Sequence, residues 1–243
     1  MDIAQLRLYA DKYETKEFIF GDPSFFMHQV EDDKDKETIA FIASCFSYGS
    51  RKQFMPKIEQ FLLFSEGHIY EWVKDGNYKN HIKKDRNQCF YRLNTQLDVF
   101  NFLERYQTLL NTYGTLKEYI RLTSDHNAQN AIKSICSYFA SCTNLIPKDT
   151  TSACKRICMF LRWMVRDNSP VDIGLWSDII DKRTLIMPLD THVLRQANNL
   201  QLIKSTNATF QTAIKLTLAV QNIFPDDPLK ADFALFGYGI DGK

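Results

Sequence analysis

Long apolar runs are missing from this sequence of 243 residues. No stretch approaches the roughly 18 apolar residues that a membrane-spanning helix requires, so we expect no membrane segment. The opening residues, MDIAQLRLYADKYE, include an early acid and lack the apolar centre of a secretory signal. These two absences favour the cytoplasm.

Glycine and proline are also scarce, with 9 and 7 residues, and alternation of apolar and polar residues is nearly absent. Strands and tight turns depend on these features, so their absence argues against a β-rich fold. No internal repeat or low-complexity linker interrupts the chain. We therefore predict an all-α fold.

Cysteine is sparse too. Six cysteines are spread thinly over a chain that is long enough to bury a core without disulfides, so we expect reduced thiols. The nearest pair, Cys154 and Cys158, lies four residues apart in a helical pattern without two further ligands close by, which argues against zinc or an iron–sulfur cluster. We predict no metal and no cofactor.

The sequence also lacks a large net charge, since its formal value is only +1. A protein with this balance has no overall attraction for nucleic acid, so any such binding requires a local basic patch.

What the sequence does contain is apolar residues at helical spacing. They predict helices at 1–16, on both sides of a polar hinge at 47–50, at 97–114 with Gly114 as the C-cap, at 115–122 and within 126–142. Further helices are expected at about 152–167, 173–181, 190–200 and 208–224, and a last one near the C-terminus. The region 66–94 is expected to hold short helices and loops.

One predicted helix carries a row of cations. In TTSACKRICMFLRWMVRDNSP, Thr151 or Ser152 can cap the helix. Arg162 and Arg166 lie roughly 20° on either side of Lys155 when viewed along the helix axis. Two interpretations are open: the row faces water, or Lys155 enters a cleft while the arginines attract phosphate or tune nearby acids.

A second segment, IMPLDTHVLRQANNL, places Asp190 directly before a helical pattern. An aspartate at this position typically caps the helix, because its carboxylate accepts hydrogen bonds from the first backbone N–H groups. Taken alone, the pattern predicts a cap and nothing more.

Together, the lysine helix and the PLDTHV segment resemble the helix–hairpin–helix glycosylase superfamily of DNA base-excision repair. IASCFSYGSRKQ is similar to an early helix of that superfamily and the polar turn after it, and DPLKADFALFGYG to its last helix. The chain looks closest to the archaeal 8-oxoguanine glycosylase branch. It also looks like a bacterial family of hypothetical proteins with KRxxMFLRWMVR and DFALFGYG signatures.

Three features depart from common members of that superfamily. IPKDTTSAC stands in place of the glycine-rich hairpin before the lysine, the separation of 35 positions from Lys155 to Asp190 exceeds the usual one, and no cysteine follows Cys158. The resemblance therefore implies a two-lobed helical fold with a degenerate hairpin and no iron–sulfur cluster. One lobe would comprise residues 36–175, and the other residues 1–35 together with 176–243.

The resemblance also implies an activity. Lys155 would attack the sugar and Asp190 would stabilise positive charge on it, which makes a DNA glycosylase with lyase activity, acting on an oxidised purine such as 8-oxoguanine. Met159, His192 and Phe236 are candidates for the pocket that receives the extruded base.

Contacts with DNA are expected mainly at the turn after the early helix and around the start of the lysine helix. The candidates are Ser47, Tyr48, Arg51, Lys52, Thr151, Ser152 and Arg195. The expected partner is double-stranded DNA with a damaged base, bound by a monomer.

A rival interpretation is a non-catalytic nucleic-acid-binding or scaffold protein of the same fold, and RNA stays open as a substrate. A separation of more than roughly 10 Å between the Lys155 amine and the Asp190 carboxylate would exclude the enzyme.

Overall fold

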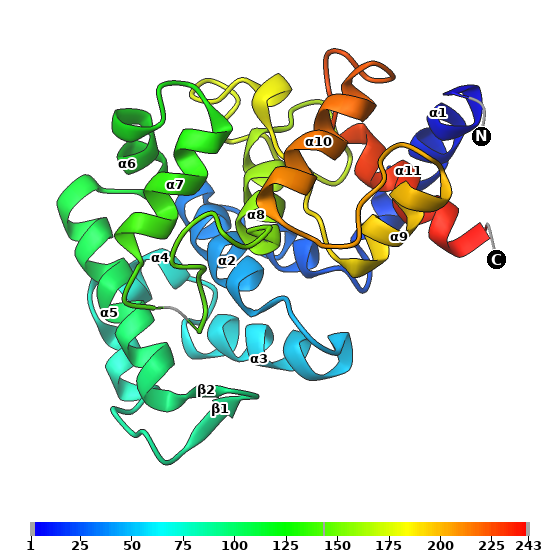
Figure 1. The fold of residues 1–243 in the computed structure, drawn as a ribbon. Helices are drawn as coiled ribbons and strands as arrows, with labels where there is room; N and C mark the ends of the chain where they lie inside the picture. The colour runs from blue at the N-terminus through cyan, green and yellow to red at the C-terminus, as the bar shows by residue number, and fades with distance from the viewer. Residues whose placement is uncertain (1–2, 143, 242–243) are drawn as a thin grey trace.

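The computed structural model describes residues 3–142 and 144–241, and helices dominate it (Figure 1). The α-helices are α1 (Ile3–Tyr13), α2 (Asp33–Phe46), α3 (Arg51–Phe64), α4 (Ile69–Lys74), α5 (Gln96–Tyr113), α6 (Leu116–Thr123), α7 (Ala128–Tyr138), α8 (Lys155–Val165), α9 (Thr191–Asn199), α10 (Phe210–Gln221) and α11 (Lys230–Asp241). Short 3₁₀ helices lie at Lys16–Ile19, Pro23–His28, Asn77–Asn80 and Lys182–Thr184. The prediction of a predominantly helical fold is confirmed.

Side chains that cap helix ends explain several of these boundaries. Asp32 accepts backbone N–H bonds at the start of α2, and Thr95 forms a reciprocal capping box with Asp98 at the start of α5. Gly114 ends α5 with a φ of 84°, as its predicted role as C-cap requires. These ends are set locally, by residues that the sequence already displays.

Helix α2 lies at the centre of the molecule and packs against α8 (Figure 1). Eleven of its residues are buried, which is typical of a helix surrounded by protein on all sides. The ring of Phe41 lies between 5.2 and 5.9 Å from those of Phe102, Tyr106, Phe139 and Phe160. This aromatic cluster joins α2 to α5, α8 and the end of α7.

The two ends of the chain meet, because α1 packs along α11 (Figure 1). The Tyr13 ring contacts that of Phe236 edge-on at 5.8 Å, and its hydroxyl donates a 2.7 Å hydrogen bond to Asp241. A Cβ on Gly237 would lie 2.1 Å from the Tyr13 ring, so only glycine permits this close approach. The division into lobes at residues 35 and 175 stays a prediction.

The prediction of a helix at 173–181 is wrong, because this segment forms turns. The backbone N–H groups at its start bond to the end of α8: Ile173 donates to Trp163 at 2.9 Å and Trp176 to Met164 at 2.6 Å. The Trp176 indole then donates to the buried carboxylate of Glu37 at 2.9 Å. These tertiary bonds hold the segment against α8, and its local hydrogen bonds form turns rather than a continuous helix.

A small β-hairpin was not expected from the sequence. β1 (Cys89–Tyr91) pairs antiparallel with β2 (Asn94–Thr95) beside α3 and α5 (Figure 1). Strands this short carry no detectable alternation. No helix in the described part of the chain is long and apolar enough to cross a membrane.

Candidate active site

Lys155 is the first residue of α8, and it follows a tight change of backbone direction. Cys154 holds a left-handed φ of 49° at the N-cap without a side-chain capping bond. The prediction that Thr151 or Ser152 caps this helix is therefore wrong. Thr151 bonds to Asp149 instead, and the Ser152 hydroxyl lies 3.4 Å from the Cys154 backbone nitrogen.

The cationic row on α8 is divided between two environments. Arg162 and Arg166 are buried. They neither face water nor are free to attract phosphate, so both of these interpretations are wrong. Both arginines pair with the buried Asp172, and Arg162 also pairs with Asp232. Lys155 alone of these three cations reaches the surface, with its side chain 38% exposed.

Arg166 extends this network to the chain ends, since it also binds Asp227, at 2.8 Å, and Glu14, at 2.7 Å. A buried charge is tolerated only when its hydrogen-bonding groups are satisfied. The network therefore fixes α8 relative to α1 and to the segment before α11.

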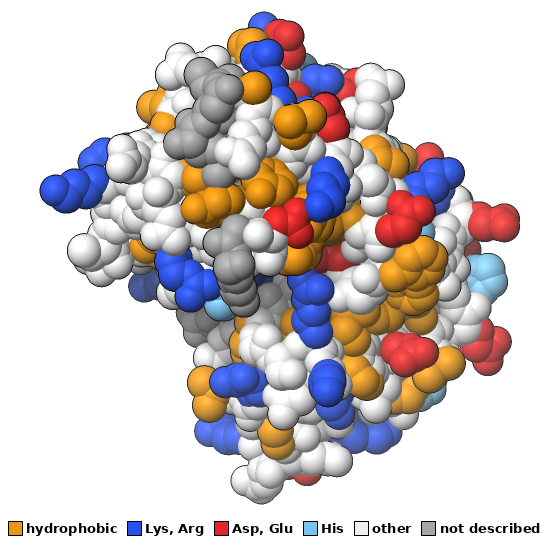
Figure 2. Space-filling view, turned by 90° about the vertical axis from the view of Figure 1, so that its right-hand side faces the viewer, with side chains coloured by type: hydrophobic (Ala, Val, Ile, Leu, Met, Phe, Trp, Pro, Cys, Tyr) orange, Lys and Arg blue, Asp and Glu red, His pale blue; other side chains and the backbone are white. Residues whose placement is uncertain are grey.

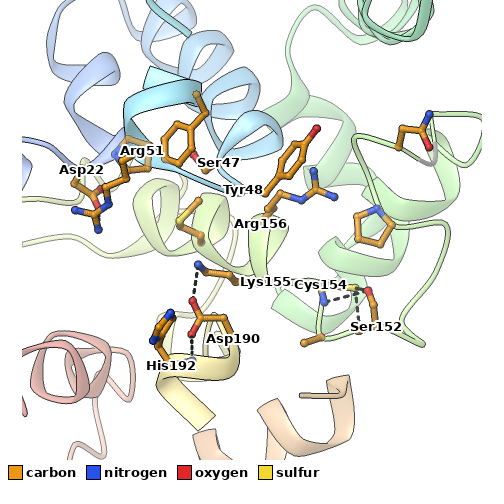
Figure 3. A pocket seen from close by; sticks show the side chains of 17 residues that line it. Asp22, Ser47, Tyr48, Arg51, Ser152, Cys154, Lys155, Arg156, Asp190 and His192 are labelled. Carbon is orange, nitrogen blue, oxygen red and sulfur yellow. Dashed lines mark hydrogen bonds and ion pairs between the residues drawn. The ribbon is translucent and has the colours of Figure 1, made fainter. Parts of the chain in front are cut away.

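Asp190 is the N-cap of α9, as predicted. Its Oδ1 accepts 2.9 Å hydrogen bonds from the backbone N–H groups of His192 and Val193. Its Oδ2 lies 2.8 Å from Nζ of Lys155 (Figure 3). Burial raises the pKa of the Asp190 carboxyl, but the charge and hydrogen bond of Lys155 and the two backbone bonds outweigh it and hold the pKa below the ordinary value.

Two hollows meet at this ion pair. The first, here called the polar groove, has a volume of about 800 Å³ and includes Ser47, Tyr48, Gly49, Ser152 and Arg156. The second, here called the apolar pocket, has a volume of about 340 Å³ and combines Phe18, Pro188, Leu235 and Phe236 with charged residues that include Arg162, Arg195 and Asp232. Lys155, Asp190, Met159, His192, Asp22 and Arg51 line both hollows.

The residues predicted for a base pocket all lie around the ion pair. Met159 and His192 border both hollows, and Phe236 borders the apolar pocket. Figure 3 shows His192 beside Asp190, at the start of α9. Phe236 also contacts Phe18 edge-on, with ring centroids 5.0 Å apart, so it serves the core as well as the pocket wall.

The residues predicted to contact nucleic acid are only partly brought together. Ser47, Tyr48, Arg51 and Ser152 line the polar groove, whereas Arg195 lines the apolar pocket. Lys52 and Thr151 are exposed but line neither hollow. The hydroxyl of Ser47 donates to the carbonyl of Ala43 at 2.6 Å, which turns it back toward α2.

Three site residues were not identified from the sequence. Arg156 follows Lys155 directly, donates to the Cys45 carbonyl at 2.7 Å and places its guanidinium 5.0 Å from the ring centre of Tyr48 (Figure 3). Burial lowers the pKa of this guanidinium. The sequence KR shows that a second basic residue follows Lys155. A helix pattern does not reveal whether Lys155, Arg156 or both face a cleft.

Asp22 and Asp232 are the other two. Asp22 borders both hollows and lies 3.8 Å from Arg51 (Figure 3). Asp232 borders the apolar pocket, and burial raises the pKa of its carboxyl against the opposing effect of Arg162. Neither acid has a sequence signal of its own, because its neighbours in space come from distant parts of the chain.

Metal ligands do not converge anywhere among residues 3–142 and 144–241, where no three histidine, cysteine or acidic side chains are placed to hold an ion. The six cysteines are free thiols, and Cys89 is the exposed one.

A family profile described as "Protein of unknown function (DUF2400)" matches residues 22–241. The chain belongs to this family. The match covers α2 to α11 and so includes Lys155, Asp190 and every residue that lines the two hollows except Phe18. No curated protein and no solved structure matches the chain.

Proposed function

We propose that this DUF2400 protein is a base-excision DNA glycosylase with lyase activity and the two-lobed helix–hairpin–helix glycosylase fold. The observation that carries the proposal is the 2.8 Å separation of Lys155 Nζ and Asp190 Oδ2 where the polar groove meets the apolar pocket. An amine and a carboxylate in contact, open to two hollows of different polarity, fit the cleavage of a bond between an apolar base and a charged sugar–phosphate.

Each hollow suits one part of a nucleotide. The apolar pocket, with Met159 and Phe236 on its walls, offers surfaces on which an extruded base can stack. The polar groove, with Tyr48, Arg51 and Arg156, offers cations and hydrogen-bonding groups to the backbone. The C1′ atom between base and backbone would then lie near Lys155.

Asp190 contributes charge that is already oriented. Cleavage of an N-glycosidic bond places positive charge on the sugar, and a fixed carboxylate stabilises that charge without reorganising. The bonds from His192 and Val193 hold the Asp190 carboxylate in place and favour its ionised form.

Lys155 contributes the nucleophile. The nitrogen attacks as a free amine, so its extra proton first passes to water in the groove. The Nζ–C1′ bond forms while the bond to the base breaks, and the base leaves with the electron pair and takes a proton from water. A second Nζ proton passes to O4′ as the C1′–O4′ bond breaks, which opens the sugar to a Schiff base, and loss of a C2′ proton then expels the 3′ phosphate.

The substrate class rests on the resemblance rather than on any single residue, and 8-oxoguanine is the lesion to test first. Incubation of the protein with duplex DNA containing 8-oxoguanine, in the presence of borohydride, should leave a covalent adduct. An abasic-site duplex separates the lyase step from base recognition. Lys155→Gln should abolish the adduct, and Asp190→Asn should slow base release on the order of 100-fold.

The chain offers a matched control pair. Lys182 and Asp167 form an ion pair at 2.6 Å with similar exposure, and neither borders the two hollows at Lys155. Lys182→Gln and Asp167→Asn should leave both activities unchanged. The absence of an adduct on both substrates, despite DNA binding, would overturn the lysine mechanism.

The rival function is a non-catalytic nucleic-acid-binding or scaffold protein. Its support is the segment IPKDTTSAC before α8, which lacks the glycines that let backbone amides approach a phosphate. Under this alternative, DNA or RNA would bind with the same affinity to the wild type and to Asp190→Asn.

A further inference from the structure

Arg156 is a half-buried cation that lines the polar groove and has no acidic partner in the described part of the chain. The one hydrogen bond that it makes there goes to the Cys45 carbonyl, so most of its five N–H donors are unused. Burial lowers its pKa, and the groups that oppose this effect are the thiols of Cys45 and Cys154 and the phenol of Tyr48 rather than carboxylates. Because a buried charge costs free energy unless an opposite charge balances it, this position favours an anionic ligand.

A second guanidinium shares the same aromatic ring. The guanidinium carbons of Arg156 and Arg92 lie 5.0 and 5.9 Å from the ring centre of Tyr48. Arg92 is exposed, and like Arg156 it takes part in none of the ion pairs that the structure describes. A Cβ on Gly49 would lie 2.5 Å from the Arg92 guanidinium, so only glycine permits this approach to the groove. The ring face attracts both cations and holds them close to each other despite their repulsion.

The Tyr48 ring is itself held in place by the β-hairpin. The Asn94 amide donates to the Tyr48 hydroxyl, and the Tyr91 hydroxyl donates to the Tyr48 backbone carbonyl. Asn94 and Tyr91 are buried, so these anchors are fixed. Figure 2 shows several Lys and Arg side chains at the level of α3 and the β-hairpin, which attract a polyanion toward this side of the molecule.

The lyase step creates the kind of charge that two unpaired arginines can accept. A C2′ proton passes to water, its electron pair forms the C2′–C3′ double bond, and the C3′–O3′ bond breaks with its pair on O3′. The phosphate that carries O3′ changes from a diester to a 5′-terminal monoester, whose charge is about −2 at neutral pH. Phosphates flank the sugar on both sides, and only the 3′ one gains charge in this step.

We propose that Arg156 and Arg92 form a site for a phosphate monoester, and that this site binds the 3′ phosphate as it leaves in the lyase step. A guanidinium can donate to two oxygens of a phosphate at once, which suits a group with three free oxygens. Contacts that strengthen while charge develops accelerate the step in which it develops. The inference deepens the proposed function and rests on it for the origin of the phosphate.

Single-turnover kinetics on duplex DNA containing 8-oxoguanine test the site, with base release and strand cleavage measured separately at saturating protein. Arg156→Gln should leave base release nearly unchanged and slow strand cleavage on the order of 100-fold. Borohydride should still trap the adduct, because the Schiff base forms but does not eliminate. Arg92→Gln removes an exposed side chain, so it should fold normally and slow the same step.

The chain offers a matched control in Arg105. Its guanidinium lies 4.0 Å from the ring centre of Tyr138 and donates to the carbonyl of that residue at 2.9 Å, yet it lines neither hollow. Arg105→Gln therefore removes an arginine stacked on tyrosine away from the site and should leave both rates unchanged.

A second measurement needs no catalysis. A duplex with a one-nucleotide gap is prepared with either a phosphate or a hydroxyl at the 5′ end that borders the gap. Wild-type protein should bind the phosphorylated end about tenfold more tightly, which corresponds to one charge-assisted hydrogen bond, and Arg156→Gln should bind both ends alike. The preference should fade as the pH falls below about 6, where the monoester takes up its second proton.

The outcomes separate the site from the proposed function. Equal affinity of wild-type protein for the two ends, or equal slowing of base release and strand cleavage by Arg156→Gln, would overturn the site. Base release by wild-type protein together with either result would leave the proposed function standing. A preference for the 5′ phosphate that Arg156→Gln removes, in a protein that releases no base, would support the site and sink the proposed function.

Discussion

Lys155 and Asp190 face one another from the N-terminal ends of two helices. Lys155 begins α8 and Asp190 caps α9, and their charged atoms are 2.8 Å apart. The N-terminus of a helix carries partial positive charge, so two such ends favour an anion between them. The Asp190 carboxylate is that anion in the free protein. A nucleotide phosphate in the adjacent groove would meet the same field.

Capping and charge at Asp190 can be separated by two substitutions. Asp190→Asn keeps an oxygen that can cap α9 and removes the charge, so it should leave the free energy of unfolding nearly unchanged and slow base release on the order of 100-fold. Asp190→Ala should cost about 1 kcal/mol of stability in addition. Thermal unfolding and single-turnover kinetics measure the two effects. Equal base release by Asp190→Asn and wild type would exclude an electrostatic role.

The pKa of Asp190 should depend on Lys155. Burial alone would raise this pKa, and Lys155 is the largest of the effects that lower it. Lys155→Gln should therefore raise the carboxyl pKa, as measured by carbon NMR titration. The control Lys182→Gln should raise the pKa of Asp167 and leave that of Asp190 unchanged. An Asp190 pKa that does not respond to Lys155→Gln would show that the pair is not formed in solution.

Asp190 also predicts a pH dependence. A carboxyl whose folded pKa is lowered stabilises the protein at pH values above its unfolded pKa, and this contribution is lost as the pH falls through the folded value. The Asp190 carboxylate also stays ionised at pH values below the ordinary aspartate pKa. Titration of Asp190 should therefore not reduce base release until the pH falls below that ordinary value. If base release is lost at a higher pH, and the residual activity of Asp190→Asn is lost with the same midpoint, the titrating group is not Asp190.

Glu37 predicts a pH dependence of the opposite sign. Burial raises its pKa to about 7, although Trp176 and the backbone N–H groups of Leu116 and Lys117 oppose the rise. Stability from the protonated acid is complete below the unfolded pKa and is lost as the pH rises through about 7. Relative to Glu37→Gln, wild-type protein should lose about 3 kcal/mol between acid and neutral pH. Denaturant titrations at several pH values test this, and parallel curves for the two proteins would contradict it.

The buried arginine network should dominate stability near the site. Arg166→Gln leaves Asp172 and Glu14 with fewer partners, and loss of one partner from a buried ion pair costs about 3–5 kcal/mol. Arg183, which pairs with Asp181 while 62% exposed, is the control, and Arg183→Gln should leave the free energy of unfolding nearly unchanged because water screens the pair. Urea unfolding compares the two. Similar losses in the free energy of unfolding for Arg166→Gln and Arg183→Gln would mean that water reaches the arginine network.

Much of the helical framework could be predicted because its signals are local. The helix at 97–114 was placed within a residue of α5, since its apolar spacing, its first-turn acid and Gly114 all lie in one segment. The cap at Asp190 is local in the same sense. The helix at 173–181 failed because its backbone groups bond to α8, which no local pattern records.

The sequence by itself determined which segments form helices, that Asp190 caps one of them, and that Lys155 begins another pattern. Only the tertiary structure decided that Arg162 and Arg166 turn inward to acids while Lys155 stays at the surface, and that Asp22 and Arg156 join the site. The physical reason is that helical periodicity places side chains on a face, whereas the burial of a charge depends on partners that folding brings from distant segments.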